Sequence, residues 1–200
     1  MILAFQGSSI DGHAYTDVVR LAQSSPSWLD DSVTFWSAYG LALFAVLMTV
    51  GWWRARRVSA TAALTALAVP VTVVVAFAVD AVLKLLVHEV RPCRSLRVST
   101  LETCPARSDW SFPSNHAAIA AAAAVALFFV ARRLGAVAVV AAGAMAVSRV
   151  WIGVHYPHDV IAGVMVGGLV ALGSMRALRR WPRDLAERLA ATRLRPLLVS

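Results

Sequence analysis

The sequence predicts an all-α protein, a polytopic transmembrane helix bundle of about five spans with an interfacial helix at its N-terminus. Of the 200 residues, 59% are apolar and 15% are charged, with a mean hydropathy of +0.68. Soluble domains are less apolar and more charged. The apolar residues form long runs, and short clusters of arginine separate those runs. The formal net charge of +8 therefore reflects membrane topology, and we expect no nucleic-acid partner.

The N-terminal segment, residues 1–32, is expected to form an arm outside the membrane core. Its first residues carry neither a basic region nor a sufficient apolar run, so they do not resemble a cleavable signal peptide. Residues 9–30 are too polar to cross a bilayer. The apolar face of an interfacial amphipathic helix is provided by Val18, Val19, Leu21 and Trp28. An ordinary exposed arm fits the pattern almost as well.

The transmembrane domain is expected to occupy residues 33–178. A helix needs roughly 20 apolar residues to cross the hydrocarbon core. Two runs satisfy that requirement outright, at residues 33–53 and 60–79. Three later runs are shorter, at residues 117–131, 134–147 and 160–175. Each of these crosses only if polar residues at one end are shielded inside the bundle.

Gly163, Gly167 and Gly168 form a stripe of small residues on the last run. Such a stripe lets two helices approach closely. We expect the stripe to mediate packing within the bundle rather than contact with a second copy, and the sequence leaves the oligomeric state open.

Three clusters of arginine fix the predicted topology. They follow the first, third and fifth apolar runs, and basic loops stay in the cytoplasm. Five spans put all three clusters inside, with the N-terminus outside and the C-terminus in the cytoplasm. Two polar segments, residues 84–113 and 150–158, then meet at the outer face. The basic tail, residues 179–200, is either an amphipathic helix on anionic lipid or a stop-transfer sequence.

Cys93 and Cys104 are the only cysteines, and both fall in the first outer segment. The predicted topology exposes this segment to an oxidising compartment. We therefore expect a disulfide between them, which closes a short loop beside Arg91, and two free thiols are the alternative.

The first of three polar clusters is KLLVHEVRP, residues 84–92. Lys84 is the single lysine of the chain, and Arg91 follows it by seven residues. On a helix, this spacing places the two cations two turns apart on nearly the same side. The alternatives for Lys84 are a salt bridge to Asp80, one turn earlier, and snorkelling to the membrane surface.

The second cluster is FPSNH, residues 112–116, which leads into the alanine-rich third run. Ser114 is well placed as the N-cap of that helix, and the free backbone N–H groups just after it create an anion site. Capping does not explain His116, at the edge of an apolar helix. A satisfied structural histidine is the alternative to a functional one.

The third cluster is SRVWIGVHYPHDV, residues 148–160, where Arg149 precedes His155 by six residues and Asp159 follows it by four. A carboxylate partner keeps one imidazole nitrogen protonated and directs the lone pair of the other nitrogen toward an electrophile. The alternative role of Asp159 is N-capping of the last helix.

Together these clusters gather cations, imidazoles, a hydroxyl and a carboxylate at one membrane face. Lys84, Arg91 and Arg149 match the three nonbridging oxygens of a phosphoryl group, over which the transition state spreads negative charge. The histidines of HYPH have neither an HExxH pattern nor a spare carboxylate beside them. We therefore expect no metal.

The three clusters resemble, in order and spacing, the signature of the type 2 phosphatidic acid phosphatase family, over about residues 33–178. The matching patterns are Lys84-x6-Arg91-Pro92, Pro113-Ser114-Asn115-His116 and Ser148-Arg149-x5-His155-x3-Asp159. The resemblance implies a lipid phosphate phosphatase that needs neither a metal nor another cofactor. His155 would be the nucleophile that becomes phosphohistidine, oriented by Asp159, and His116 would protonate the leaving oxygen. The phosphoryl oxygens would be held by Lys84, Arg91, Ser114, Asn115 and Arg149.

Asn115 and His158 differ from the other polar residues of the three clusters, and each has its own expected role. Asn115 stands where many members carry glycine, and we expect this difference to alter affinity more than chemistry. His158 adjoins Asp159 and is expected only to line the site or to cap the last span. Replacing His155 by alanine should then abolish turnover, whereas His158→Ala should leave most of it.

Within the family, the chain is most similar to bacterial undecaprenyl diphosphate phosphatases in its short length and in its RVWIGVHYPxDV motif. This similarity implies a polyprenyl diphosphate substrate and a site at the outer face of a bacterial plasma membrane. Phosphatidic acid and phosphatidylglycerol phosphate stay open as alternative substrates. An anion transporter is the rival from another class, but it predicts polar residues throughout the bilayer depth.

Overall fold

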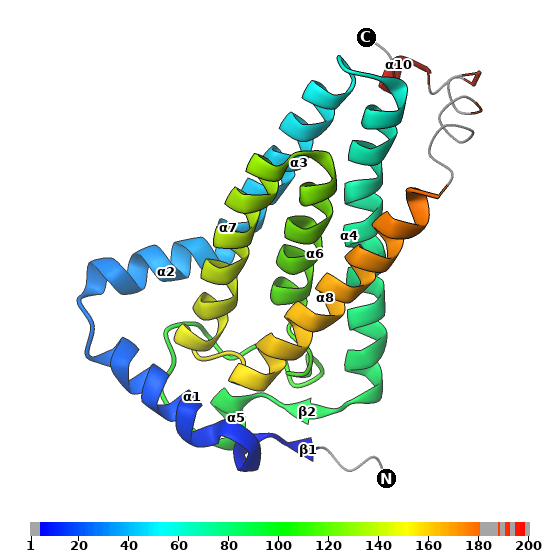
Figure 1. The fold of residues 1–200 in the computed structure, drawn as a ribbon. Helices are drawn as coiled ribbons and strands as arrows, with labels where there is room; N and C mark the ends of the chain where they lie inside the picture. Colours follow the sequence, from blue (N-terminus) through cyan, green and yellow to red (C-terminus); the bar gives the residue numbers. More distant parts are fainter. Residues whose placement is uncertain (1–4, 181–187, 189–190, 193–194, 199–200) are drawn as a thin grey trace.

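The computed structural model describes residues 5–180, 188, 191–192 and 195–198, and these are mostly helical (Figure 1). Strand pairing within these residues is limited to β1 (Phe5–Gln6) beside β2 (Glu89–Val90), in parallel. The predicted all-α fold is confirmed. The helices are α1 (Ser8–Gln23), α2 (Ser27–Tyr39), α3 (Leu41–Ala55), α4 (Ala60–Leu86), α5 (Pro92–Ser95), α6 (Asn115–Val130), α7 (Arg132–Trp151), α8 (Pro157–Leu178) and α10 (Arg195–Leu198).

Helix α6 lies at the centre of the bundle, with α3, α4, α7 and α8 packed around it (Figure 1). All of its alanines, from Ala117 to Ala126, are buried. Small side chains let the surrounding helices approach closely, and a helix that is apolar on every side belongs in the interior of a bundle. The alanine-rich sequence therefore makes α6 the core of the molecule.

The candidate membrane crossings agree only in part with the expected five. By length and composition α4, α7 and α8 can each cross a membrane, and the pair of α2 and α3 can make a fourth crossing. The apolar helix α6 is shorter, at 16 residues.

The single helix expected over residues 33–53 is instead two helices that meet at Gly40 with a bend of 52°. A Cβ at Gly40 would lie 2.5 Å from the backbone oxygen of Trp36, so this close turn needs a glycine. As a consequence α2 turns away from the direction of α3 and projects sideways from the bundle beside α7 (Figure 1).

The N-terminal arm contains a helix, α1, which packs against α5, α7 and α8 at the same end as β2 (Figure 1). Tyr15, Val19 and Ala22 are its buried apolar side chains. The arm is therefore part of the packed protein at this end and covers the loops that follow α4 and α7.

The glycine stripe of α8 faces α6. A Cβ at Gly163 would lie 2.5 Å from the backbone oxygen of Ser114, and a Cβ at Gly167 would overlap the backbone oxygen of Ala118. Gly168 has more space, since the nearest atom, on Val125, would be 4.0 Å away. For Gly163 and Gly167, the expectation of close packing inside the bundle is confirmed.

The amphipathic tail expected at residues 179–200 lies mostly outside the described residues. Its described part includes α10, whose Leu198 packs against Ala63 and Leu64 at the start of α4. This contact is at the end of the bundle opposite to α1 and α5 (Figure 1).

Candidate active site

The three polar clusters meet at the end of the bundle that α1 and α5 cover. Helices α4 and α7 end there, and α6 and α8 begin there (Figure 1). Lys84 lies in the last turn of α4 and Arg149 in the last turn of α7. His155 lies in the short connection from α7 to α8, and Asp159 in the first turn of α8. Residues from distant parts of the sequence thus share one site.

His155 is 2% exposed and faces a carboxylate with one ring nitrogen and a guanidinium with the other. Its Nδ1 lies 3.5 Å from Oδ2 of Asp159, and its Nε2 lies 3.3 Å from Nη1 of Arg91. A guanidinium can only donate hydrogen bonds. Nε2 therefore carries the lone pair, and Nδ1 carries the proton toward Asp159.

Burial lowers the pKa of His155 well below its ordinary value of 6.5, and the positive charges of Arg91, Arg149 and Lys84 lower it further. The imidazole is neutral at pH 7 as a result. A neutral ring with its lone pair on Nε2 is the form that can attack an electrophile.

Asp159 is fully buried and is held by several donors. Its Oδ2 accepts hydrogen bonds from the hydroxyl of Ser111, at 2.5 Å, and from the backbone N–H of Tyr156, at 2.8 Å. The second bond belongs to a capping box at the start of α8, so the predicted capping role and an orienting role coincide. Ser111 was not among the residues expected from the sequence.

Lys84 and Arg91 converge on Asp109, which lies in the loop before α6. Nζ of Lys84 is 3.6 Å from Oδ1 of Asp109, and Nη2 of Arg91 is 2.9 Å from its Oδ2. Lys84 also donates to the backbone oxygen of Trp110, at 2.8 Å. No salt bridge joins Lys84 to Asp80 in the described structure, so that alternative is wrong.

The expectation that Lys84 and Arg91 share one helix is also wrong. Helix α4 ends at Leu86, the chain then forms β2, and Arg91 is the N-cap of α5. Pro92 disfavours a helical conformation for the residue before it, and β2 pairs with β1 instead. The two cations reach the same place because the chain turns back, not because of helical spacing.

Arg149 is 6% exposed and lies between two acceptors from distant segments. Its Nη1 donates to the hydroxyl of Ser37 on α2, at 2.7 Å, and lies 3.9 Å from Oε2 of Glu102. Its Nε is buried without a hydrogen-bond partner in the described structure. One donor of this guanidinium thus stays available for an anion.

The segment from Ser114 to His116 begins α6. The backbone N–H of Ser114 donates to the backbone oxygen of Asp159, at 3.0 Å, which joins the second cluster to the third. Ser114 is the N-cap, but its hydroxyl makes no capping bond and is buried without a partner. Oδ1 of Asn115 is likewise unpartnered. These groups lie beside the free N–H groups of a helix N-terminus, where anions bind favourably.

His116 is the second residue of α6 and is part of the same charged group. Its imidazole interacts electrostatically with Arg149, Lys84 and Arg91, and it contributes to the electrostatic environment of His155. The described structure gives its side chain no hydrogen bond or ion pair. His116 is therefore near the site and has a free ring for proton transfer.

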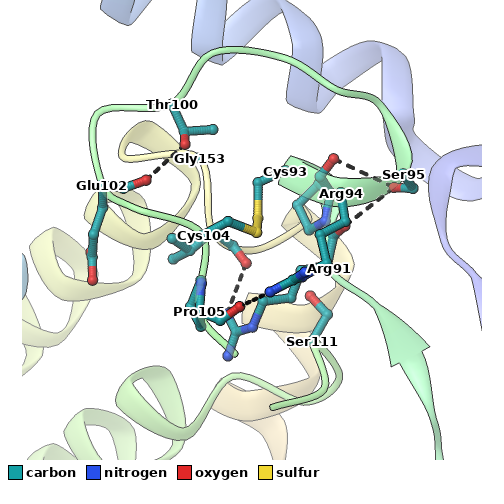
Figure 2. The surroundings of a disulfide bond; sticks show 12 residues. Arg91, Cys93, Arg94, Ser95, Thr100, Glu102, Cys104, Pro105, Ser111 and Gly153 are labelled. Carbon is teal, nitrogen blue, oxygen red and sulfur yellow. Dashed lines mark hydrogen bonds between the residues drawn. A yellow bond between two sulfur atoms is a disulfide. The ribbon is translucent and has the colours of Figure 1, made fainter. Parts of the chain in front are cut away.

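A disulfide between Cys93 and Cys104 staples the loop beside Arg91, as Figure 2 shows. The two Cα atoms are 6.0 Å apart. Arg94 donates to the backbone oxygen of Pro105 across the same loop. Because the loop is closed in this way, it holds Glu102 near Arg149 and leads back toward Asp109.

A cavity of about 240 Å³ opens beside the site, lined by Val90, Arg91, Arg94, Arg107, Asp109 and Trp110. Arg94 and Arg107 add two cations to those expected from the sequence. No motif in the sequence singled out Asp109, Glu102, Ser111 or Ser37, because their roles depend on where the loop before α6 and the end of α2 lie in the folded chain.

His158 does more than line the site. Its two ring nitrogens face carboxylates of Asp11 and Glu89, at 2.8 and 2.9 Å. Ligand atoms of Glu89, His158 and Asp159 lie within 4.8 Å of one another, which is the spacing of a possible metal group in the described residues. The same atoms form the ion pairs of His158 with Glu89 and Asp159, so the expectation that no spare carboxylate lies near these histidines is wrong.

Known proteins resemble the chain in both sequence and fold. Residues 61–183 match the family model described as the PAP2 superfamily. Undecaprenyl-diphosphatase BcrC of Bacillus subtilis (strain 168) is 29% identical over 144 residues, which cover 72% of each protein.

Two solved structures share the architecture. One is a PAP2-type phosphatidylglycerolphosphate phosphatase from Bacillus subtilis, with a TM-score of 0.65 and 21% identity over 84% of this chain and 86% of that one. The other is LpxE from Aquifex aeolicus, with a TM-score of 0.68 and 20% identity over 87% of this chain and 99% of that one.

Proposed function

This chain belongs to the PAP2 superfamily and is a membrane lipid phosphatase, and from this we propose that it removes the terminal phosphate of a polyprenyl diphosphate such as undecaprenyl diphosphate. The observation that carries the proposed chemistry is the orientation of His155. Its Nε2 meets Arg91 while its Nδ1 faces Asp159. The nucleophilic nitrogen held in this way faces the cations that would bind the nonbridging oxygens of a phosphoryl group.

Two observations favour a diphosphate substrate. The relative from Bacillus subtilis that covers most of this chain is named an undecaprenyl-diphosphatase. In addition, Arg94 and Arg107 line the cavity next to Arg91. A diphosphate carries more negative charge than a phosphate monoester, so the two extra cations suit its second phosphoryl group.

The first chemical step is attack of His155 Nε2 on the terminal phosphorus. A nitrogen–phosphorus bond forms while the bond from phosphorus to the bridging oxygen breaks. His116 gives a proton to that oxygen, and polyprenyl monophosphate leaves. Lys84, Arg91 and Arg149, with the N-terminus of α6, stabilise the charge on the nonbridging oxygens.

The second step is hydrolysis of phosphohistidine. Water attacks the phosphorus, His116 accepts the proton of that water, and the nitrogen–phosphorus bond breaks. Inorganic phosphate leaves, and His155 regains its neutral form. The carboxylate of Asp159, held by Ser111 and by the backbone of Tyr156, stabilises the charge that develops on the ring.

The proposed orientation puts the site at the outer face of a bacterial plasma membrane, with the C-terminus in the cytoplasm. The support is the distribution of arginines. Arg54, Arg132 and Arg133 line a cavity of about 440 Å³ that lies away from the catalytic clusters, where α3, α4, α6 and α7 meet. Basic residues next to spans favour the cytoplasmic side.

The test is a substrate panel with purified protein in EDTA. Undecaprenyl diphosphate, phosphatidic acid and phosphatidylglycerol phosphate are compared by kcat/KM, with His155→Ala as the control for contaminating phosphatases. We expect the highest kcat/KM with undecaprenyl diphosphate. We also expect His155→Ala to lose turnover by at least about a thousandfold.

The possible outcomes test the substrate, the nucleophile and the phosphohistidine step separately. A preference for another lipid would reject the polyprenyl substrate but keep the chemistry. Equal turnover by the wild-type protein and His155→Ala would reject the assigned nucleophile. Acid-labile phosphate trapped on the protein at His155 during turnover would support the phosphohistidine step.

A further inference from the structure

His158 lies between two carboxylates that come from opposite ends of the N-terminal half. Its Nδ1 is 2.8 Å from Oδ1 of Asp11 on α1, and its Nε2 is 2.9 Å from Oε1 of Glu89 on β2. An ionised carboxylate accepts hydrogen bonds and cannot donate them. Both ring nitrogens therefore carry protons, and His158 is an imidazolium cation.

The ring of His158 touches every cluster of the active site. It stacks on Tyr156, with centroids 5.3 Å apart and planes 17° apart, and more loosely on Phe112, at 6.1 Å and 29°. Its Nε2 is also 3.4 Å from Oδ1 of Asp159. These contacts fix the plane of the ring and so the direction of its two N–H bonds.

Asp11 contacts both the backbone and the ring of His158. Its Oδ2 accepts the backbone N–H of His158, at 2.7 Å, while its Oδ1 meets the ring. Within α1 the backbone of Asp11 departs from helical geometry, with φ −143° and ψ 27°. At this irregular position the carboxylate contacts the start of α8.

Further contacts attach the arm on both sides of Asp11. A Cβ at Gly7 would collide with Oε1 of Glu89, so the arm passes the buried carboxylate closely. Residue 5 of β1 pairs with residue 89 of β2. On the other side, the hydroxyl of Tyr15 donates to the backbone oxygen of Gly153, at 2.9 Å, in the loop before His155.

The charges explain why a cation is needed at this point. Glu89 is 1% exposed and Asp159 is fully buried, and both lie within hydrogen-bonding or ion-pairing distance of His158. Buried carboxylates that are close together repel each other, and a buried charge without a partner is costly. The positive charge of the imidazolium lies beside both carboxylates, offsets their repulsion and favours the ionised form of Asp159 beside the nucleophile.

We propose that Asp11, His158 and Glu89 form an electrostatic clamp through which the N-terminal helix positions Asp159, and with it His155. Asp11, His158 and Glu89 are positioning residues, because they act on the nucleophile through Asp159. The effect of the clamp on turnover depends on the phosphatase function proposed above, whereas its protonation and its contacts do not. The clamp also revises the expectation that His158→Ala leaves most turnover.

The kinetic test uses Asp11→Asn and His158→Gln, with Asp17→Asn as the matched control. Asp17 is an exposed carboxylate on the same helix, so its variant changes the same charge outside the clamp. We expect kcat to fall about tenfold for Asp11→Asn and for His158→Gln. A loss of this order is found when a residue that orients a functional side chain through a hydrogen bond is removed. KM should change little because the phosphate-binding cations are untouched. Asp17→Asn should match the wild-type protein.

A double variant tests whether the residues act as one unit. If the clamp exists, Asp11→Asn combined with His158→Gln should lose hardly more kcat than either single variant. Fully additive losses would show two independent effects and overturn the proposal. So would single variants with the same kcat as Asp17→Asn, measured per folded molecule.

The readout that is independent of activity is nitrogen-15 NMR of the five histidines. Both ring nitrogens of His158 should be protonated at pH 7.5, where an ordinary histidine is neutral. Resonances of a neutral ring for His158 would refute the clamp, as would a change in them on adding EDTA, which would indicate a metal. If the wild-type protein hydrolyses none of the lipids, the proposed function fails while this measurement still decides on the clamp.

Discussion

The three cations that bind phosphate in the proposed mechanism already lie beside carboxylates of the protein. Asp109 contacts both Lys84 and Arg91, and Glu102 lies near Arg149. Asp109 is 46% exposed, so water partly screens its ion pairs and they are weak enough to exchange. A phosphoryl group with more negative charge would displace it. These acidic side chains keep the buried cations neutralised when no substrate is bound.

Replacing Asp109 by asparagine tests this competition. The substitution removes the negative charge that a substrate must displace, so we expect KM to fall by about threefold to tenfold, equivalent to about 1 kcal/mol of binding. The kcat value should change little because Asp109 contacts neither His155 nor Asp159 in the described structure. Steady-state kinetics with the preferred lipid measures both constants.

The control for this variant is Asp31→Asn, which changes an exposed carboxylate on α2. A similar fall in KM for Asp31→Asn would indicate a general effect of net charge. A rise in KM for Asp109→Asn would mean that Asp109 holds the cations in place rather than competing with the substrate.

At the scale of elements, the contact between α6 and α8 carries the site. The backbone N–H of Ser114 at the start of α6 bonds to the backbone oxygen of Asp159 at the start of α8. Gly163 and Gly167 let the two helices remain in close contact below that bond. A change in their separation would move the anion site of α6 relative to the nucleophile.

Gly167→Ala is expected to reduce the free energy of unfolding by about 1–3 kcal/mol, because the new methyl group overlaps the backbone of Ala118. Gly173→Ala is the matched control on the same helix, since a Cβ at Gly173 has no atom within 4 Å. Alanine has a higher helix propensity than glycine, so the control should be neutral or slightly stabilising. Unfolding in detergent, followed by circular dichroism, compares the two. Equal stability of both variants would contradict the close packing of α6 and α8.

At the scale of the whole molecule, the fold separates two charged ends. The catalytic clusters, the N-terminal arm and the disulfide lie at one end, and the arginines that follow α3 and α6 lie at the other (Figure 1). The bundle between them is apolar and alanine-rich. This polarity predicts a defined orientation in the membrane.

The orientation can be measured with reporters fused after residue 200 in a bacterial host. A green fluorescent protein fused there should fluoresce, and an alkaline phosphatase should be inactive, because the C-terminus is expected in the cytoplasm. Mass spectrometry without reductant should recover Cys93 linked to Cys104 in protein from the same cells. Active alkaline phosphatase, or alkylation of both thiols in the native protein, would contradict the orientation.

The sequence alone predicted the all-α bundle, the family and the residues gathered in the site. Apolar runs reveal helices that bury their surfaces in lipid or in one another, and costly polar groups within such runs stand out. One short segment of the sequence contains Arg149, His155 and Asp159, so chain order alone brings these three residues close together. The break at Gly40 was missed because a single glycine within an apolar run is compatible with a continuous helix, and only the packing around Trp36 shows the bend.

Only the tertiary structure decided which side chains surround the nucleophile. Ser111 bonds to Asp159, Asp109 pairs with Lys84 and Arg91, and Arg149 is contacted by Glu102 and Ser37. Asp11 reaches His158 from the N-terminal arm. These contacts join residues far apart in the chain, and no periodicity or motif encodes them. The sequence determined the chemical groups, because their residue types are costly in a membrane and their local spacing is regular. The folded chain determined their partners, since hydrogen bonds and ion pairs depend on distances that form only when the bundle and its loops close.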